Sequence, residues 1–170
     1  MIALGIDPGT TGGVAALAPS GALIFAMRTP HSQAEGYDLQ KMLDALRELQ
    51  RLGAGVCALE VARPFTSLAR TAGTPKTYMA QARGRALWEM ALAAAAIRCV
   101  PLEPARWHRQ IPLPRGDKKR AKRLAVSKAI ERWPLAEKVI GRARAESGVA
   151  DALWIAEWMR RELAVMPATG

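Results

Sequence analysis

The 170-residue sequence predicts an α/β domain on a mixed sheet, in which three antiparallel strands are followed by parallel strands and helices cover both faces. Three observations predict this. Three short apolar runs, separated by turn-forming residues, fill the first 28 positions; strand and helix patterns then alternate; the C-terminal part reads as helix. Because half of the residues are apolar and the length suits one hydrophobic core, we expect a single domain over residues 1–170.

The first two strands form a predicted hairpin that presents an acid. Ile2–Ile6 is an apolar run of the kind a buried strand needs, and it ends on Asp7. Pro8 and Gly9 make a turn before the second apolar run, Val14–Leu17. Asp also suits the first position of such a turn, so Asp7 by itself is as compatible with a structural role as with a catalytic one.

The remaining elements follow from periodicity. Leucine and methionine recur at helical spacing in 37–52, with Gly53 as the stop, and 55–61 is a buried-strand run. The expected strands are 2–7, 12–18, 21–28, 55–61 and 97–102, and the expected helices are 37–52, 77–97 and 148–164. A basic segment at 105–128 runs into a helix that ends near 133–134, and loops are expected at 29–36, 63–76 and 134–147.

The charge indicates a polyanionic partner. The formal net charge is +10 and the pI is near 10.4. A solvent-exposed helix normally carries both positive and negative side chains. Between Arg106 and Lys128, however, Asp117 is the only acid among several basic residues, which predicts a phosphate-binding face. The candidate DNA contacts are Arg106, Arg115, Lys118, Lys119, Lys122 and Arg123, joined by Arg63, Arg70 and Lys76 of the 63–76 loop.

Three acids sit at the ends of apolar elements. Glu60 lies late in the strand 55–61, and Asp151 lies in the first turn of the last helix, on the face of Ile155 and Trp158. An isolated buried carboxylate is costly unless it is paired or binds a metal. The alternatives are an edge strand that exposes Glu60 and a helix dipole that favours Asp151. Together with Asp7, these acids predict a site for Mg²⁺, with Mn²⁺ as a substitute.

The segment Gly5–Thr11, GIDPGTT, resembles two known families: the phosphate-binding hairpin of actin-like ATPases and the first strand of RuvC-like Holliday junction resolvases. The latter carry an Asp ending the first strand, a Glu ending the fourth, and an Asp in the last helix within a pattern like A-D-A-L. The chain matches at Asp7, Glu60 and Ala150–Leu153. Gln81–Arg85 resembles the start of the family's central helix, and Pro104–Trp107 resembles a P-x-x-W segment of phage-type members.

The resemblance implies a ribonuclease-H-like fold and metal-dependent, symmetric cutting of four-way DNA junctions by a homodimer built on helix 79–97. Lys118 or Lys119 would lie near the scissile phosphate. The family usually has an acid or a histidine three or four residues before the last Asp, where this chain has Gly148 and Ser147. Glu146 is then the candidate fourth metal ligand, or else a solvent-facing loop residue.

Other functions stay open on the sequence alone. A related nuclease could act on flaps, other branched DNA or RNA–DNA hybrids, a non-catalytic DNA-binding module could use the same basic face, and the actin-like ATPase remains a third possibility. The sequence shows neither a membrane span nor a signal peptide, which favours a cytoplasmic protein. Cys57 and Cys99 fall in predicted buried strands without metal-ligand spacing, and we expect both to be reduced core thiols.

Overall fold

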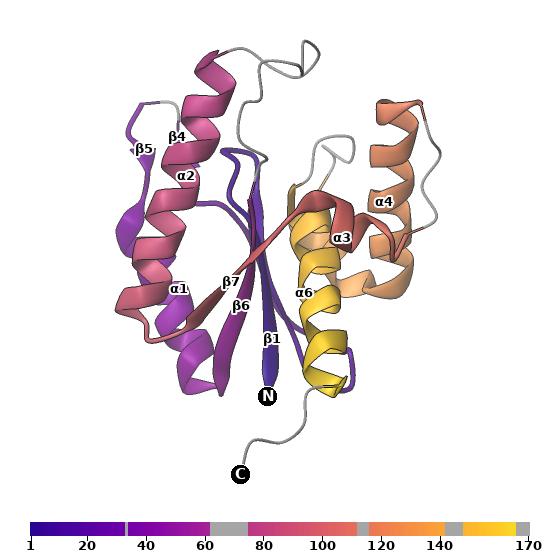
Figure 1. Ribbon diagram of the computed structural model, residues 1–170, viewed down its shortest axis with the longest axis horizontal. Coiled ribbons are helices and arrows are strands. Elements are labelled where there is room, and N and C mark those ends of the chain that lie inside the picture. The colour runs from indigo at the N-terminus through magenta and orange to yellow at the C-terminus, as the bar shows by residue number, and fades with distance from the viewer. Residues whose placement is uncertain (33, 62–74, 112–115, 142–147, 166–170) are drawn as a thin grey trace.

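A five-stranded mixed sheet forms the centre of the computed structural model, which describes residues 1–32, 34–61, 75–111, 116–141 and 148–165 (Figure 1). The strand order is β3-β2-β1-β6-β7; β1 pairs with β2 and β2 with β3 antiparallel, whereas β1, β6 and β7 run parallel. The bounds are β1 Ile2–Asp7, β2 Gly13–Leu17, β3 Leu23–Arg28, β6 Ala54–Glu60 and β7 Arg98–Leu102. The predicted mixed sheet is therefore confirmed.

Helices cover both faces of this sheet, as expected (Figure 1). On one face lie α1 (Leu39–Arg51) and α2 (Pro75–Ala94), whose apolar side chains share a core with β1 and β6. On the other face lies α6 (Gly148–Val165), with α3 (Pro104–His108) and α4 (Lys118–Arg132) packed beside it. Among the described residues, no helix is long and apolar enough to cross a membrane.

Two local predictions were wrong. The expected loop 29–36 contains the small ladder of β4 (His31–Ser32) and β5 (Gly36–Tyr37), and the expected loop at 134–147 contains the 3-10 turn η1 (Pro134–Ala136) and α5 (Glu137–Ile140). The basic segment includes a first short helix, α3, and then runs into α4, which ends at Arg132 as predicted. The end of α5 depends on a distant residue, because the Arg28 side chain of β3 donates hydrogen bonds to the carbonyls of Val139 (3.2 Å) and Ile140 (2.7 Å). Such long-range contacts leave no local pattern in the sequence.

The two cysteines face each other across β6 and β7, where Cys57 and Cys99 are register partners. Both thiols are free, and Cys57 is buried as expected. Cys99 is only half-buried, because β7 is an edge strand of the sheet and covers one side of it less completely.

Glycines bring helices from both faces close to the β1–β2 hairpin. A Cβ atom at Gly5 would lie 2.2 Å from the Ala156 nitrogen of α6, and one at Gly84 of α2 would lie 2.2 Å from the Pro8 carbonyl oxygen. A side chain at either position would push its helix away from the hairpin. Both helices therefore reach the end of β1, where the site described next is located.

Candidate active site

The three acids converge at one end of the sheet. Asp7 and Glu60 are the last residues of β1 and β6, which are neighbouring parallel strands and therefore end at the same edge. Glu60 does not lie on an edge strand, because β6 is flanked by β1 and β7. Asp151 reaches this edge from the first turn of α6, which packs across β1. All three residues are mostly buried.

Gly148 accounts for the way α6 meets Asp7. Its N–H donates to the carbonyl of Thr11 (3.1 Å). A Cβ atom at this position would lie 2.4 Å from the Gly12 Cα and 2.5 Å from Asp7 Oδ2. The helix terminus is thus seated directly on the hairpin, and there is no room for a side chain. The missing acid or histidine at position 148 follows from this close packing, so a fourth ligand would come from elsewhere.

Burial and mutual repulsion make the three carboxylates harder to ionise. Burial, reinforced by the charge of Asp151, raises the pKa of Asp7 to about 6, although the Gly9 N–H donates to Asp7 Oδ1 (3.1 Å). Burial and the charge of Asp7 raise the pKa of Glu60 to about 7. Burial also raises the pKa of Asp151, and Lys122 opposes this increase. The positive charge beside the site therefore does not fully neutralise its three carboxylates.

Two neighbours hold the acids in place: Lys122, which sequence reasoning assigned to DNA contact, and Trp107, to which it assigned no role in the site. Lys122 of α4 forms an ion pair with Asp151, joining its Nζ to Oδ2. The Trp107 indole N–H of α3 donates to Glu60 Oε2 at 2.7 Å. Trp107 is buried, and its indole orients an acid. A sequence signal for Lys122 existed: alanines three and seven residues further on, Ala125 and Ala129, place it on an apolar stripe of α4, and the structure buries both alanines.

The donor chemistry fits a hard divalent cation. Carboxylate oxygens are the ligands that Mg²⁺ and Mn²⁺ prefer, and three carboxylates face one ammonium here. Within the described part of the chain, however, no three Asp, Glu, His or Cys side chains converge closely enough to enclose an ion. The contacts of Asp151 with Lys122 and of Glu60 with Trp107 direct those carboxylates to protein groups instead.

The predicted DNA-contact residues are only partly described. Arg63, Arg70, Arg115 and Glu146 lie outside the described residues, as do the side chains of Lys76 and Lys118. Arg106 and Lys119 are exposed, and the Arg106 guanidinium lies 5.0 Å from the centre of the Trp158 ring. Partial burial lowers the pKa of His108, and the charge of Asp151 opposes this shift.

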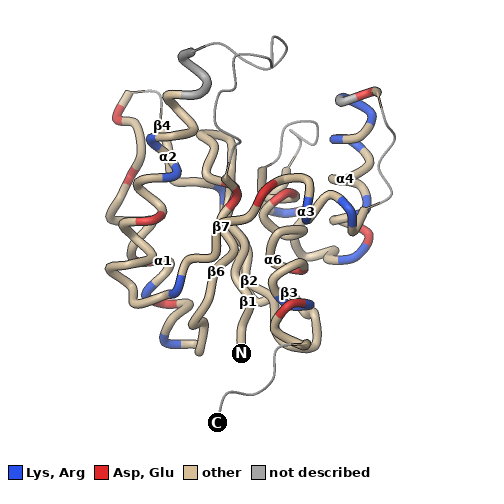
Figure 2. The backbone as a smooth tube through the Cα atoms, viewed as in Figure 1, with Lys and Arg blue, Asp and Glu red and all other residues tan. Residues whose placement is uncertain are grey.

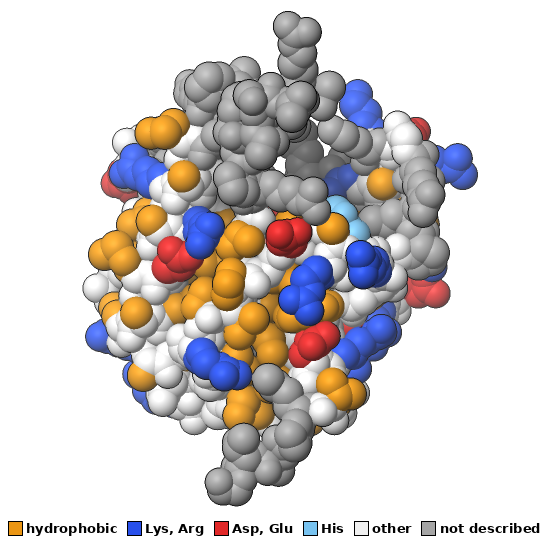
Figure 3. Space-filling model, in the orientation of Figure 1, with side chains coloured by type: hydrophobic (Ala, Val, Ile, Leu, Met, Phe, Trp, Pro, Cys, Tyr) orange, Lys and Arg blue, Asp and Glu red, His pale blue; other side chains and the backbone are white. Residues whose placement is uncertain are grey.

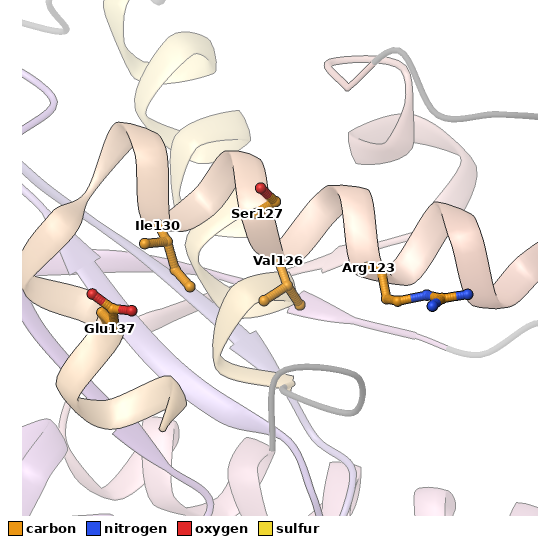
Figure 4. Close-up of a pocket in the computed structure, with 5 residues that line it drawn as sticks. All are labelled: Arg123, Val126, Ser127, Ile130 and Glu137. Carbon is orange, nitrogen blue, oxygen red and sulfur yellow. The ribbon is translucent and has the colours of Figure 1, made fainter. Parts of the chain in front are cut away.

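The basic face expected on α4 is divided. Basic residues follow the helix from its start (Figure 2), but Lys122 turns towards Asp151, whereas Arg123 is exposed and lines a separate cleft of about 290 Å³. Figure 4 shows that cleft between α4 and α5. Its lining residues are Arg123, Val126, Ser127, Ile130 and Glu137. Adjacent basic residues of one helix therefore face different surroundings.

Comparison with solved structures identifies the fold. The structure matches Thermus thermophilus RuvC in complex with a Holliday junction substrate with a TM-score of 0.59 and 18% identity, covering 95% of this chain and 96% of that one. The chain has a RuvC-like fold. A second Thermus thermophilus RuvC structure gives a TM-score of 0.59 at 19% identity over 96% and 97% of the two chains. The yeast mitochondrial Holliday junction resolvase Ydc2 gives 0.51 at 16% identity over 94% and 78%.

At the level of sequence, no family model and no curated protein matches the chain. Since the structural likeness lies below 20% identity, it establishes the fold and leaves the activity to be argued from the site itself.

Proposed function

We propose that the protein is a divalent-metal-dependent endonuclease that resolves four-way DNA junctions by two symmetric phosphodiester cuts. One observation carries this proposal: three carboxylates from β1, β6 and α6 converge at one edge of a RuvC-like sheet, with too little positive charge beside them to neutralise them. The fold match extends over nearly the whole chain and includes a RuvC bound to a Holliday junction substrate, which favours branched DNA over other nucleic acids.

Each acid has a distinct support in this chain. Asp7, Glu60 and Asp151 would bind Mg²⁺, or Mn²⁺ in its place, and the bound ions would supply Lewis acidity and an activated water. The Gly9 N–H orients Asp7, and the Trp107 indole orients Glu60. Fixed carboxylates matter because a metal site must hold its ligand geometry tightly. Glu146 remains a proposed fourth ligand, since position 148 cannot supply one.

The basic residues would position the DNA. The net charge of +10 favours binding to phosphates in general. The exposed residues Arg106, Lys119 and Arg123 lie on α3 and α4. The same two helices supply Trp107 and Lys122 to the acids. Lys118 begins α4 and is proposed, with Lys119, to approach the scissile phosphate. Phosphate contacts and the acid site would thus be brought together by α3 and α4.

A homodimer would supply two sites for two symmetric cuts, and α2 offers a surface for it. Met79 and Met90 on α2 are 72% and 60% exposed. Exposed alanines continue this stripe at helical spacing: Ala82, Ala86 and Ala93. Apolar side chains are visible on the α2 side of the face drawn in Figure 3. An apolar helix face of this kind favours a second copy of the chain over solvent.

The dimer is tested by light scattering and sedimentation. We expect a two-chain mass for the wild type, and we expect Met90→Glu to weaken association at least tenfold, because it places a charge in the stripe. Leu135→Glu is the control, since Leu135 is 68% exposed on η1, away from α2. A monomer at micromolar concentration, with and without junction DNA, would refute the dimer.

The activity is tested with a panel of four-way junctions, flaps, RNA–DNA hybrids and plain duplexes, each with and without Mg²⁺. We expect symmetric cuts in the four-way junction that require the ion and disappear in Asp7→Asn and Glu60→Gln, while junction binding survives. Asp44→Asn on the exposed side of α1 is the matched control. Preference for another substrate would indicate a related nuclease, whereas tight binding without cutting would indicate a DNA-binding module.

A further inference from the structure

We propose that Lys122 closes the acid site in the absence of DNA, and that a DNA phosphate opens it by drawing the ammonium group away from Asp151. The inference rests on the proposed function and concerns the regulation of that site. It would make DNA binding and divalent-cation binding mutually reinforcing.

The first support is the ion pair itself. Lys122 Nζ contacts Asp151 Oδ2, and the two residues lie 29 positions apart on two different helices. The two side chains are 29% and 16% exposed, so the pair is shielded from water but still reachable. The ammonium occupies one of the two carboxylate oxygens of Asp151, and its positive charge repels a metal ion from the other, so the two cations compete for Asp151.

The second support is the contrast with the other two acids. Asp7 is held by the backbone N–H of Gly9, and Glu60 by the indole N–H of Trp107, both rigidly placed donors. Each leaves other carboxylate lone pairs available for a cation. Lys122 instead brings a full charge on a flexible four-carbon stem, which can turn away without moving a helix. Of these three contacts, the one made by Lys122 is the easiest to exchange.

The third support is the position of Lys122 on α4. Lys119, one turn before it, is exposed. A DNA backbone attracted by Lys119 would pass the acid site, within reach of a side chain one turn away. A phosphate then offers the ammonium a second anionic partner. Because the couplings of linked binding events are equal, DNA would raise cation affinity by the same factor by which the cation raises DNA affinity.

The size of the effect follows from the population of the closed pair. If the pair is closed for about 70–90% of the time, the apparent cation affinity of the DNA-free protein falls by about three- to tenfold. Removing the ammonium should recover that factor. Lys122→Met is the suitable change, because methionine preserves an unbranched apolar stem at a half-buried position.

The binding experiment is Ca²⁺ titration calorimetry on the DNA-free protein. We expect Lys122→Met to bind Ca²⁺ about three- to tenfold more tightly than the wild type, and the control Lys138→Met, at an exposed lysine of α5, to stay within about twofold. Asp7→Asn should lose binding, which identifies the site. Equal affinity of Lys122→Met and wild type would overturn the inference while leaving the metal site intact. Absence of Ca²⁺ binding in both would overturn the metal site and, with it, the inference.

A second measurement separates direct competition from the loss of a nearby positive charge. The ¹⁵N-edited NMR signal of the Lys122 ammonium, assigned by its absence in Lys122→Met, should shift when Ca²⁺ is added. It should also shift when junction DNA is added in EDTA, where no cation is present. If the signal does not shift on addition of Ca²⁺, or does not shift on addition of DNA, the ammonium stays on Asp151. Either result would refute the proposed movement of Lys122 away from Asp151.

Discussion

The two halves of α6 each bury a carboxylate, but the two carboxylates have opposite surroundings. Asp151, in the first turn, shares its region with Asp7 and Glu60 and has the ammonium of Lys122 as a partner. Glu157, less than two turns later, is fully buried and accepts hydrogen bonds from Arg132 (2.8 Å), Arg160 (2.7 Å) and Arg161 (2.8 Å). The surroundings of Asp151 therefore have excess negative charge, whereas the surroundings of Glu157 have excess positive charge.

The pKa values follow this difference. Burial raises the pKa of Asp151, and Lys122 does not fully compensate. Burial also acts to raise the pKa of Glu157, but the hydrogen bonds from Arg160 and Arg161 outweigh it, so that pKa is lowered. A buried carboxylate with enough cationic donors forms ion pairs that link parts of the fold, whereas a buried carboxylate without enough donors is available to bind a further cation. Sequence reasoning found Asp151 and overlooked Glu157, although Arg160 and Arg161 lie three and four residues after it on α6. Of these three partners, Arg132 alone is brought to Glu157 by packing between helices.

The largest expected effect is on cleavage, and it should separate the two ends of α6. Asp151→Asn should lower the cleavage rate by about a thousandfold or more, because the contribution of a bound ion is several kcal/mol. Glu157→Gln should leave the cleavage rate of the folded protein within about threefold, since its arginine partners lie away from the acid site. Single-turnover cleavage of a four-way junction measures both. Comparable losses in the two variants would show that Glu157 is as important for cleavage as Asp151.

The next effect concerns stability, where Glu157→Gln should be more damaging than Asp151→Asn. Glu157→Gln should lower the free energy of unfolding by about 2–4 kcal/mol, because three guanidinium groups lose a buried counter-charge. Glu131→Gln, an exposed change on α4, should cost less than about 0.5 kcal/mol. Urea denaturation monitored by tryptophan fluorescence gives both values. If the two variants unfold at the same urea concentration, the ion pairs of Glu157 do not stabilise the fold.

The pH dependence of stability should have opposite signs at the two ends. Asp7 and Glu60 have folded pKa values of about 6 and about 7, above their ordinary values of 3.8 and 4.5, so the folded protein binds more protons. Their contribution to stability is therefore complete below about pH 4 and is lost as the pH rises through 6 and 7. Glu157 has a lowered pKa, so its contribution is present above pH 4.5 and is lost as the pH falls.

Asp7→Asn tests this sign in the metal-free protein. Its free energy of unfolding should match the wild type near pH 4 and exceed it by about 1–3 kcal/mol near pH 8, because the variant no longer ionises a buried group. Glu157→Gln should show its greatest destabilisation at neutral pH. Denaturant titrations in EDTA across this range provide the curves. Parallel curves for Asp7→Asn and the wild type would contradict the raised pKa.

The smallest expected effect concerns the exposed basic residues. Lys118→Ala combined with Lys119→Ala should flatten the dependence of log affinity on log salt by about one unit per lost phosphate contact. Lys41→Ala with Arg47→Ala, both exposed on α1, is the control pair and should leave the slope unchanged. Junction binding measured by fluorescence anisotropy at several salt concentrations distinguishes them. If the slope follows α1 instead, the DNA lies on the other face of the sheet.

The elements and the positions of the three acids were accessible from the sequence, because both depend on local patterns. Apolar runs of strand length predicted β1, β2 and β6 within a residue at each end, and helical spacing predicted α1 and α6. An acid that ends an apolar run is a visible anomaly in such a pattern, since ionised groups are rarely buried without a partner. The order of strands and helices was sufficient to predict a mixed sheet with helices on both faces.

The partners of those acids were decided by tertiary structure alone. Lys122 and Trp107 reach the acids from helices distant in sequence, as Arg132 reaches Glu157, and no local pattern encodes these pairings. Arg160 and Arg161 differ, since they lie one turn after Glu157 on α6 itself. Gly148 shows the same limit: its role is visible only when α6 is seated on the hairpin, where a Cβ atom would collide with Asp7 and Gly12. The sequence by itself determined where the carboxylates are. Packing decided how their charges are balanced, because that balance depends on distances between elements.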